Sequence, residues 1–479
     1  MRESAKNLFI LVILEVLTVF EAAKAILQAT GVLHSNNVVF AITGSFRNPG
    51  PLGGFIAMGM SAACAYLAIN RRWNNLNFNR KLIYLLSVAT FSLGVIILPA
   101  TMSRAGWLAF GVAAIILAFK ELKLGKWLMS HKTVKSFSAI IVLSLCLLAF
   151  KLKPDSALGR IHIWHMECRS IAEKPWTGHG NVLGAYGATQ ARYFMEKERS
   201  ETIVQLAGSP EYAFNEYLQA AVELGIPLAV CLLVVVVLCL YRGVRKGRYG
   251  ICGAILSLMI FSFSSYPLQL PVFIVTFGGL LVACLSGADR WQWLGLAVSV
   301  GIIGGFRLKN DLQVEQACRE WMNARVLYNA GAYQSAEKEY GRLYPLLRDR
   351  ASFLFEYGHG LHKQQQFSKS NRILKEALQR SCDPMILNVI GKNYQQMGDC
   401  LSAEDWFIRS THRLPGRIYP YYLLAKLYAE PSFRQPDKFE KMKWMVLTKE
   451  PKVHSTAIRQ MREEIKKIQL IFVHIKKDE

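Results

Sequence analysis

Apolar residues form long uninterrupted runs over roughly the first two thirds of the chain and recur at helical spacing among polar residues over the remainder. A helix needs about 20 apolar residues to cross a hydrocarbon core about 30 Å thick. After residue 307 the sequence contains no run of that length, so we expect a transmembrane domain over residues 1–307 and a soluble domain over residues 308–479. Before residue 307 the sequence predicts nine spans, at residues 7–28, 51–70, 81–102, 104–120, 136–152, 214–241, 250–267, 270–287 and 291–307.

The basic residues predict which loops stay in the cytoplasm, because positively charged loops are retained there. The short loops that alternate with these positively charged loops contain almost no basic residue besides Arg47. Residues 28–51, the long loop 152–213 and the C-terminal domain then lie on the exported side, which in a bacterium is the periplasm or its equivalent. We therefore expect a multi-pass protein of the inner membrane. The loops predicted to be cytoplasmic carry Arg71, Arg72, Arg80 and Lys81; then Lys120, Lys123, Lys126, Lys132 and Lys135; then Arg242, Arg245, Lys246 and Arg248; and finally Arg290.

The composition points the same way. Hydrophobic residues make up 52% and charged residues 19%, whereas a soluble domain has about 25% charged residues, so an ordinary cytosolic enzyme is excluded. The formal net charge of +23 is read as a membrane-topology signal, and we expect no nucleic-acid partner. Six of the ten cysteines lie within predicted spans, and the others match no zinc-binding spacing. We expect no metal and no cofactor.

The C-terminal region repeats itself with a period of 33 or 34 residues. A small residue, an aromatic residue, a second small residue and a large apolar residue at this period are typical of tetratricopeptide repeats. A stack of generic helical hairpins is the alternative. Either fold predicts a surface that binds a protein partner and brings no chemistry of its own. The aligned sets are Ala324, Gly358 and Gly391; Leu327, Leu361 and Tyr394; Tyr333, Phe367 and Cys400; Ala336, Ser370 and Ala403; and Tyr340, Leu374 and Phe407.

Candidate chemistry gathers in the long exported loop and in the segments predicted to face it. A charged residue inside a span costs several kcal/mol unless it is paired or hydrated, which makes Arg104 and Glu216 functional candidates. Arg104 could instead extend outward to the lipid headgroups, and Glu223, on the same helical face as Glu216, could simply pair with a basic residue. The further candidates are Arg47, Arg160, His162, His165, Arg169, His179, Arg192 and Glu211.

Two of these patterns allow a simpler interpretation. His162 and His165 are three residues apart, as a metal-binding pair can be, but no third ligand stands at helical spacing from them. His179 lies between two glycines in PWTGHG, which is either a plain turn or a flexible turn that presents an imidazole.

Arginines at the outer membrane face beside a His or Glu that accepts a proton suit transfer from a lipid-anchored pyrophosphate. Guanidinium groups bind phosphate oxygens through two parallel hydrogen bonds and stabilise a pyrophosphate leaving group. A nearby base deprotonates the acceptor hydroxyl. We therefore expect Arg47, Arg104, Arg160 and Arg192 to bind the pyrophosphate.

The order SFRNPGPLGGF, TMSRAGW, GRIHIW, KPWTGHG and AFNEYLQAAVELGIP over residues 40–290 resembles the O-antigen ligase and polymerase superfamily. The resemblance implies an all-α fold, a transmembrane bundle of the GT-C type followed here by a soluble tetratricopeptide α-solenoid. It implies a metal-independent transfer of a glycan from undecaprenyl pyrophosphate. The acceptor would be lipid A core, a growing polysaccharide or a hydroxyl group of an exported protein. An appended tetratricopeptide region resembles superfamily members found in the Bacteroidetes.

Carried over by position, Arg104 matches the family's arginine after the serine, and Arg160 matches the arginine that opens the large loop. Many members carry a histidine just before the asparagine of AFNEYLQ, where this chain has Phe214. The resemblance therefore leaves His179, Glu211 or Glu216 as the catalytic base.

Members usually carry several more spans before the matching region, so an N-terminal truncation is one interpretation of this sequence. A membrane glycan ligase is the favoured function, with a polysaccharide polymerase as its close variant. A transporter or scaffold that uses the repeats for assembly is the non-enzymatic alternative, although a transporter should show paired broken helices or internal repeats within its spans.

Overall fold

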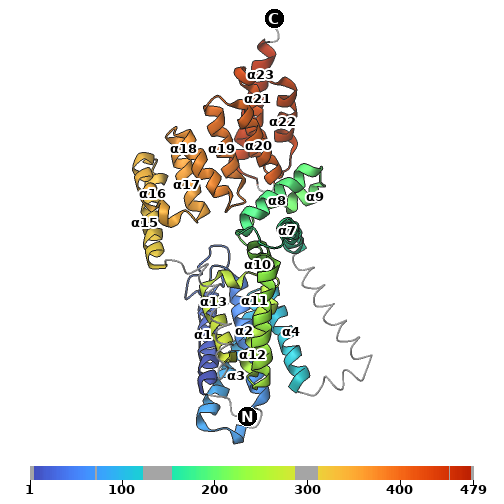
Figure 1. Ribbon diagram of the computed structural model, residues 1–479, viewed down its shortest axis with the longest axis vertical. Helices are drawn as coiled ribbons and strands as arrows, with labels where there is room; N and C mark the ends of the chain where they lie inside the picture. The colour runs from blue at the N-terminus through green and yellow to red at the C-terminus, as the bar shows by residue number, and fades with distance from the viewer. Residues whose placement is uncertain (1–4, 71–72, 122–153, 286–310, 452–453, 476–479) are drawn as a thin grey trace. The chain divides into compact units, whose positions relative to one another are not determined.

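The computed structural model describes residues 5–70, 73–121, 154–285, 311–451 and 454–475, and these residues form helices joined by turns, without a strand (Figure 1). The all-α prediction is therefore confirmed. The chain divides into two compact units: unit 1 comprises Met1–Pro154 and Ala213–Arg307, and unit 2 comprises Asp155–Tyr212 and Leu308–Glu479. The domain boundary expected at residue 307 lies outside the described residues.

Unit 1 is a bundle of apolar helices that correspond to most of the predicted spans. Three of them are long and apolar enough to cross a membrane, namely α2, α3 and α11. The spans predicted at residues 136–152 and 291–307 lie outside the described residues. The elements are α1 (Ala5–Ala29), α2 (Pro49–Ile69), η1 (Trp73–Asn75), α3 (Phe78–Ala100), α4 (Arg104–Glu121), α10 (Glu216–Leu224), α11 (Ile226–Arg245), α12 (Tyr249–Ser262), η2 (Pro267–Gln269) and α13 (Pro271–Leu285).

Helix α2 is the centre of this bundle, because its small residues let α1, α3, α4 and α12 pack closely around it. A Cβ atom on Gly54 would overlap the Phe261 ring of α12, and one on Gly59 would overlap Thr18 of α1. Small residues at such contacts permit the close backbone approach on which helix packing in membranes depends.

The sixth predicted span, residues 214–241, is wrong as a single helix, because the structure forms two helices there. Helix α10 ends at Leu224, and α11 begins at Ile226. The break is at Gly225, whose φ of +83° favours glycine, and Pro227 then occupies the first turn of α11. Glu216 and Glu223 therefore lie on a separate short helix rather than within the membrane-spanning α11.

Unit 2 consists of the loop predicted to be exported and of the C-terminal helices. From α15 onward the helices pack in consecutive pairs, α15 with α16, α17 with α18, α19 with α20 and α21 with α22. The elements are α7 (Pro154–Glu173), α8 (Val182–Glu196), α9 (Glu201–Leu206), α15 (Asp311–Asn329), α16 (Tyr333–Leu347), α17 (Ala351–Lys363), α18 (Phe367–Leu378), α19 (Pro384–Gln396), α20 (Cys400–Arg413), α21 (Tyr419–Ala429), η3 (Pro431–Phe433), α22 (Pro436–Thr448) and α23 (Thr456–Ile475).

The positions aligned from the sequence form the contacts within these pairs. Ala336 and Ala403 are buried, and so are Tyr340, Leu374 and Phe407. A side chain in place of Gly358 or Gly391 would meet Leu374 or Phe407, respectively, on the second helix of the same pair. The assignment of the pairs as tetratricopeptide repeats stays a prediction.

The exported loop packs against the second half of the C-terminal helices. Helix α8 contacts α20, where its Gly187 lies against the guanidinium of Arg413, and its Gly184 lies against the backbone of Gln379 at the end of α18. The loop helices and the repeat helices therefore fold as one compact unit.

We predict opposite effects on stability for two alanine substitutions at buried helix glycines. Both gain helix propensity, worth about 1 kcal/mol. Gly360→Ala places its Cβ 3.9 Å from the nearest described atom, on Tyr328, whereas the Cβ of Gly391→Ala overlaps Phe407, and such overpacking costs about 1–3 kcal/mol. In thermal unfolding of the purified full chain followed by circular dichroism, Gly360→Ala should keep or raise the midpoint and Gly391→Ala should lower it. A raised midpoint in both variants would contradict the packing.

Candidate functional site

Arg47 follows a loop that two buried side chains of α1 hold in place. The Gln28 side chain accepts hydrogen bonds from the backbone N–H groups of Thr43 and Gly44, at 2.9 and 2.8 Å, and donates one to the Gly44 carbonyl at 3.0 Å. The Glu21 carboxylate accepts from the Ser45 N–H at 2.8 Å. The loop backbone before Arg47 is thus fixed by side-chain hydrogen bonds, while the Arg47 side chain itself is exposed.

Arg104 begins α4, and the turn before it touches the segment that contains Arg47. The Ser103 hydroxyl donates to the Gly50 carbonyl at 3.2 Å, and Gly50 is in the first turn of α2. Asn48 caps that turn by accepting from the Gly50 N–H at 2.9 Å. Unit 1 therefore brings Arg47 and Arg104 to the same end of the bundle, as the sequence predicted from topology.

An aromatic cluster joins this end to the loop between α12 and α13. The rings of Phe46, Phe55 and Phe273 lie with centroids 5.6–6.0 Å apart, and Phe261 stacks on Phe273 at 6.1 Å. Edge-to-face and offset contacts at such distances are favourable for aromatic pairs. The segment of residues 262–270 is thereby anchored close to the residues that precede α2.

Glu216 binds this same segment. Its carboxylate accepts hydrogen bonds from the Leu268 N–H at 2.7 Å and from the Gln269 side chain at 3.1 Å, and the residue is buried. Gln219 donates to Glu223 at 3.0 Å, which places these two side chains on one face of α10. Both Glu216 oxygens therefore hold the backbone and side chain of the α12–α13 loop, and unit 1 brings Glu216 to the loop that the Phe cluster anchors.

In unit 2, the predicted residues of the exported loop spread along α7. Arg160 lies near its beginning, and His162 faces inward, with Nε2 donating to Gln190 Oε1 at 3.2 Å. Burial lowers the pKa of His162, so its imidazole is neutral at pH 7. His165 is exposed, with its ring against Tyr193, and among the described residues no three potential metal ligands cluster.

His179 occupies the turn that follows α7. Gly178 and Gly180 have φ values of +67° and +76°, so both flanking positions require the left-handed conformation that glycine permits. The imidazole Nε2 lies 2.8 Å from the Ser170 carbonyl, which can only accept. Nε2 therefore carries the proton, and Nδ1 of the neutral ring is an acceptor. The turn presents the imidazole in one tautomer.

Two arginines of the loop are paired with carboxylates. Arg192 donates to both oxygens of Glu173, at 2.7 and 2.5 Å, and Arg169 pairs with Glu196. Arg192 lies with His179 near the end of α7, whereas Arg160 is ten residues before Ser170, or about 15 Å along the helix axis. Glu211 is exposed. The structure therefore brings His179 and Arg192 together and places Arg160 at the other end of α7.

Gln190 is a central residue that the sequence did not reveal. Its side chain is 1% exposed. Oε1 accepts from His162 and from the Tyr186 hydroxyl, and Nε2 donates to the carbonyls of Gly208 and Arg413, at 3.2 and 2.6 Å. This one amide links α7, α8, the end of the loop and the end of α20. Because Gln190 and Arg413 are far apart in the chain, only the folded structure reveals the contact.

Comparison with known proteins gives one family. Residues 89–233 match the family described as O-antigen ligase. The matched segment contains Arg104, Arg160 and His179 but neither Arg47 nor the C-terminal helix pairs. No curated protein matches the chain. The matched segment supports the resemblance of this chain to the O-antigen ligase superfamily, and the candidate spanning helices support an integral membrane protein.

Proposed function

We propose that this protein transfers a glycan from undecaprenyl pyrophosphate to an acceptor on the exported side of the inner membrane. That it is an integral membrane protein of the O-antigen ligase or polymerase type follows from the matched segment and the spanning helices. The single observation that carries the finer proposal is the meeting of the Arg47 segment with the Arg104 turn through the hydrogen bond from Ser103 to Gly50.

Arg47 and Arg104 would hold the pyrophosphate. Guanidinium groups match phosphate oxygens in geometry and charge, and they stabilise the negative charge that grows on the leaving pyrophosphate. Arg160 is the further cation that the resemblance assigns to the pyrophosphate. Arg192 would contribute only after its pair with Glu173 opens, because that carboxylate already neutralises its charge.

His179 would act as the catalytic base. Nδ1 removes the proton of the acceptor hydroxyl, the oxygen attacks the anomeric carbon, and the bond from that carbon to the phosphate oxygen breaks. Undecaprenyl pyrophosphate departs with the bonding electrons. Glu216 is the second candidate, although both of its oxygens already bind the α12–α13 loop, and Glu211 is the third.

The acceptor would be lipid A core or a hydroxyl of an exported protein. The C-terminal helix pairs would bind a protein partner as tetratricopeptide repeats and bring it to the exported loop. The contacts of α8 with α20 support this role, because they join the loop to the repeats within one unit. A growing polysaccharide as acceptor would make the same chemistry a polymerase reaction.

Arg104→Ala should abolish glycan transfer while membrane abundance stays normal. Loss of one preorganised donor to a developing negative charge costs about 10²–10³ in rate. The matched control is Arg80→Ala, which removes an arginine from the opposite end of α3. Transfer is measured in membranes of a deletion strain by the shift of the glycan from carrier to acceptor. Full transfer by Arg104→Ala would refute the assigned role.

His179→Gln should lower the transfer rate by about 10²–10⁴, the usual contribution of a positioned base. Glu216→Gln should instead reduce the abundance of folded protein, because its carboxylate holds the α12–α13 loop. If Glu216→Gln is abundant and folded but inactive, Glu216 rather than His179 would be identified as the base.

Reporter fusions test the orientation independently of activity. A reporter that is active only in the periplasm should be active when fused after Glu479 and inactive when fused after Lys246, which lies in a predicted cytoplasmic loop. The reverse pattern would place the exported loop and the repeats in the cytoplasm and would exclude the proposed reaction.

A further inference from the structure

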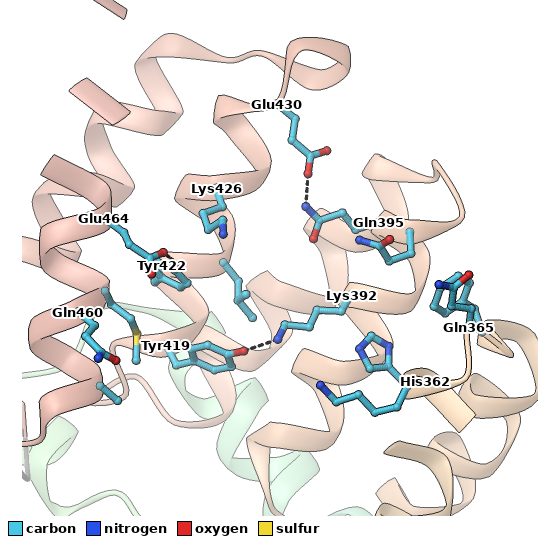
Figure 2. Close-up of a pocket in the computed structure, with 16 residues that line it drawn as sticks. His362, Gln365, Lys392, Gln395, Tyr419, Tyr422, Lys426, Glu430, Gln460 and Glu464 are labelled. Carbon is cyan, nitrogen blue, oxygen red and sulfur yellow. Dashed lines mark hydrogen bonds between the residues drawn. The ribbon is translucent and has the colours of Figure 1, made fainter. Parts of the chain in front are cut away.

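A groove in unit 2 has no role in the proposed reaction. It has a volume of about 700 Å³ and is lined by α17, α19, α21 and α23 together with the adjoining turns (Figure 2). Small-molecule sites usually enclose about 300–1,000 Å³. The groove therefore has the size of a site for a short oligomer.

The groove carries cations at equivalent positions of successive helix pairs. Arg325, His359, Lys392 and Lys426 follow the aligned small residues Ala324, Gly358, Gly391 and Ala425. The first of these cations is neutralised, because Arg325 pairs with Glu356 at 3.0 Å. Of the later ones, Lys392 and Lys426 line the groove, whereas His359 does not.

The lysines of the groove lack carboxylate partners. Elsewhere in the described repeats, Lys438 pairs with Glu404 and Lys443 with Glu440. Within the same described residues, Lys363, Lys392 and Lys426 form no ion pair. Lys392 instead contacts the Tyr419 hydroxyl (Figure 2). Two carboxylates also line the groove, but Glu430 accepts a hydrogen bond from Gln395 and Glu464 accepts one from Tyr422. Three lysines therefore face two carboxylates, which leaves an excess of positive charge.

Two histidines beside the lysines are affected by the same positive charges. Burial, followed by the neighbouring His362 and the charges of Lys363 and Lys392, lowers the pKa of His359 to about 4. Burial also lowers the pKa of His362, and Lys392 and Lys363 add to the effect. Both imidazoles are therefore neutral at pH 7, and the lysines of the lining outnumber its two carboxylates, so the groove favours an anion.

The rest of the lining is rich in groups that bind hydroxyls. Gln365, Gln395, Gln396 and Gln460 each offer a carbonyl acceptor and an amide donor. The rings of Tyr419 and Tyr422 stack with centroids 6.2 Å apart and an angle of 18°. The electron-rich face of an aromatic ring attracts the partial positive charge on the hydrogen atoms of C–H groups.

Few apolar side chains line the groove, chiefly Phe367, Leu423 and Met461. Protein interfaces depend on a few aromatic or aliphatic anchors buried in apolar pockets. The polar lining therefore fits a hydroxylated chain better than a peptide.

We propose that this groove binds an anionic glycan, with Lys392 and Lys426 contacting its carboxylate or phosphate groups and the amides contacting its hydroxyls. The inference rests on the proposed function only in taking the bound chain to be the glycan that the membrane site transfers. It adds a second glycan site in unit 2, distinct from the pyrophosphate-binding arginines of unit 1.

Calorimetric titration of the purified full chain in detergent tests this directly. The probes are hexagalacturonate for carboxylates, pentamannosyl phosphate for phosphate, maltohexaose as the neutral glycan and hexaglutamate as the acidic peptide. At least one anionic glycan should bind at least about tenfold more tightly than maltohexaose and hexaglutamate, and added salt should weaken this binding. Equal binding of maltohexaose, or tighter binding of hexaglutamate, would overturn the proposal.

The variant Lys392→Gln/Lys426→Gln should weaken binding of the preferred anionic glycan by at least about tenfold. Lys369→Gln is the matched control, since this exposed lysine of α18 is outside the groove; the same loss in this control would refute the site. The single variant Lys426→Gln removes one exposed charge and serves if the double variant fails to fold. Arg104→Ala should retain this binding, so a failure of the transfer reaction is distinguishable from a failure of the groove.

Discussion

Buried carboxylate and amide side chains that bind backbone N–H groups hold together the end of the membrane bundle that carries Arg47 and Arg104. Gln28 and Glu21 fix the loop before Arg47, and Glu216 fixes the α12–α13 loop. Unsatisfied backbone groups cost several kcal/mol in an apolar environment, so irregular segments at this depth need such partners. The charged residues in the predicted spans therefore serve first to stabilise the fold. The cations at the bundle end can be placed because these side chains fix the backbone that carries them.

In unit 2, a neutral side-chain amide likewise holds several segments of the chain together. Gln190 uses its two acceptor and two donor positions on groups from four segments of the chain, and a fully satisfied buried network rigidifies what it joins. The glycines of α8 complete the contact by bringing its backbone against the end of α18 and against Arg413 of α20. An event on the C-terminal helix pairs, such as binding of a ligand, is therefore mechanically linked to α7, which carries His162, and to the turn that carries His179. This linkage gives a physical reason for an envelope enzyme to carry appended helix pairs.

The sequence predicted the elements well where a local pattern determines them. Helices α1 to α4 coincide with predicted spans to within a few residues, and the 33- and 34-residue spacing located the buried contacts of the helix pairs. It failed at residues 214–241, because average hydropathy does not register the Gly225 to Pro227 break, although glycine followed by proline is itself a readable stop-and-start signal. The docking of α8 on α20 and the role of Gln190 depend on contacts between distant segments, which no local pattern encodes. Arg192 was chosen for its charge, and only the structure shows Glu173 beside it.

Charge pairing separates the cations of this chain into two classes. Where the fold needs a cation for architecture, a carboxylate lies beside it, as for Arg192 with Glu173 and Arg325 with Glu356. An exposed pair such as Arg192 with Glu173 contributes little free energy, about 0–1 kcal/mol, but both pairs cancel the local field. Lys392 and Lys426 form no ion pair among the described residues, and the groove that they line has three lysines against the carboxylates of Glu430 and Glu464. A polyanion that reaches the groove would thus meet a positive field that the protein neutralises only in part, while the paired arginines of the loop would barely attract it.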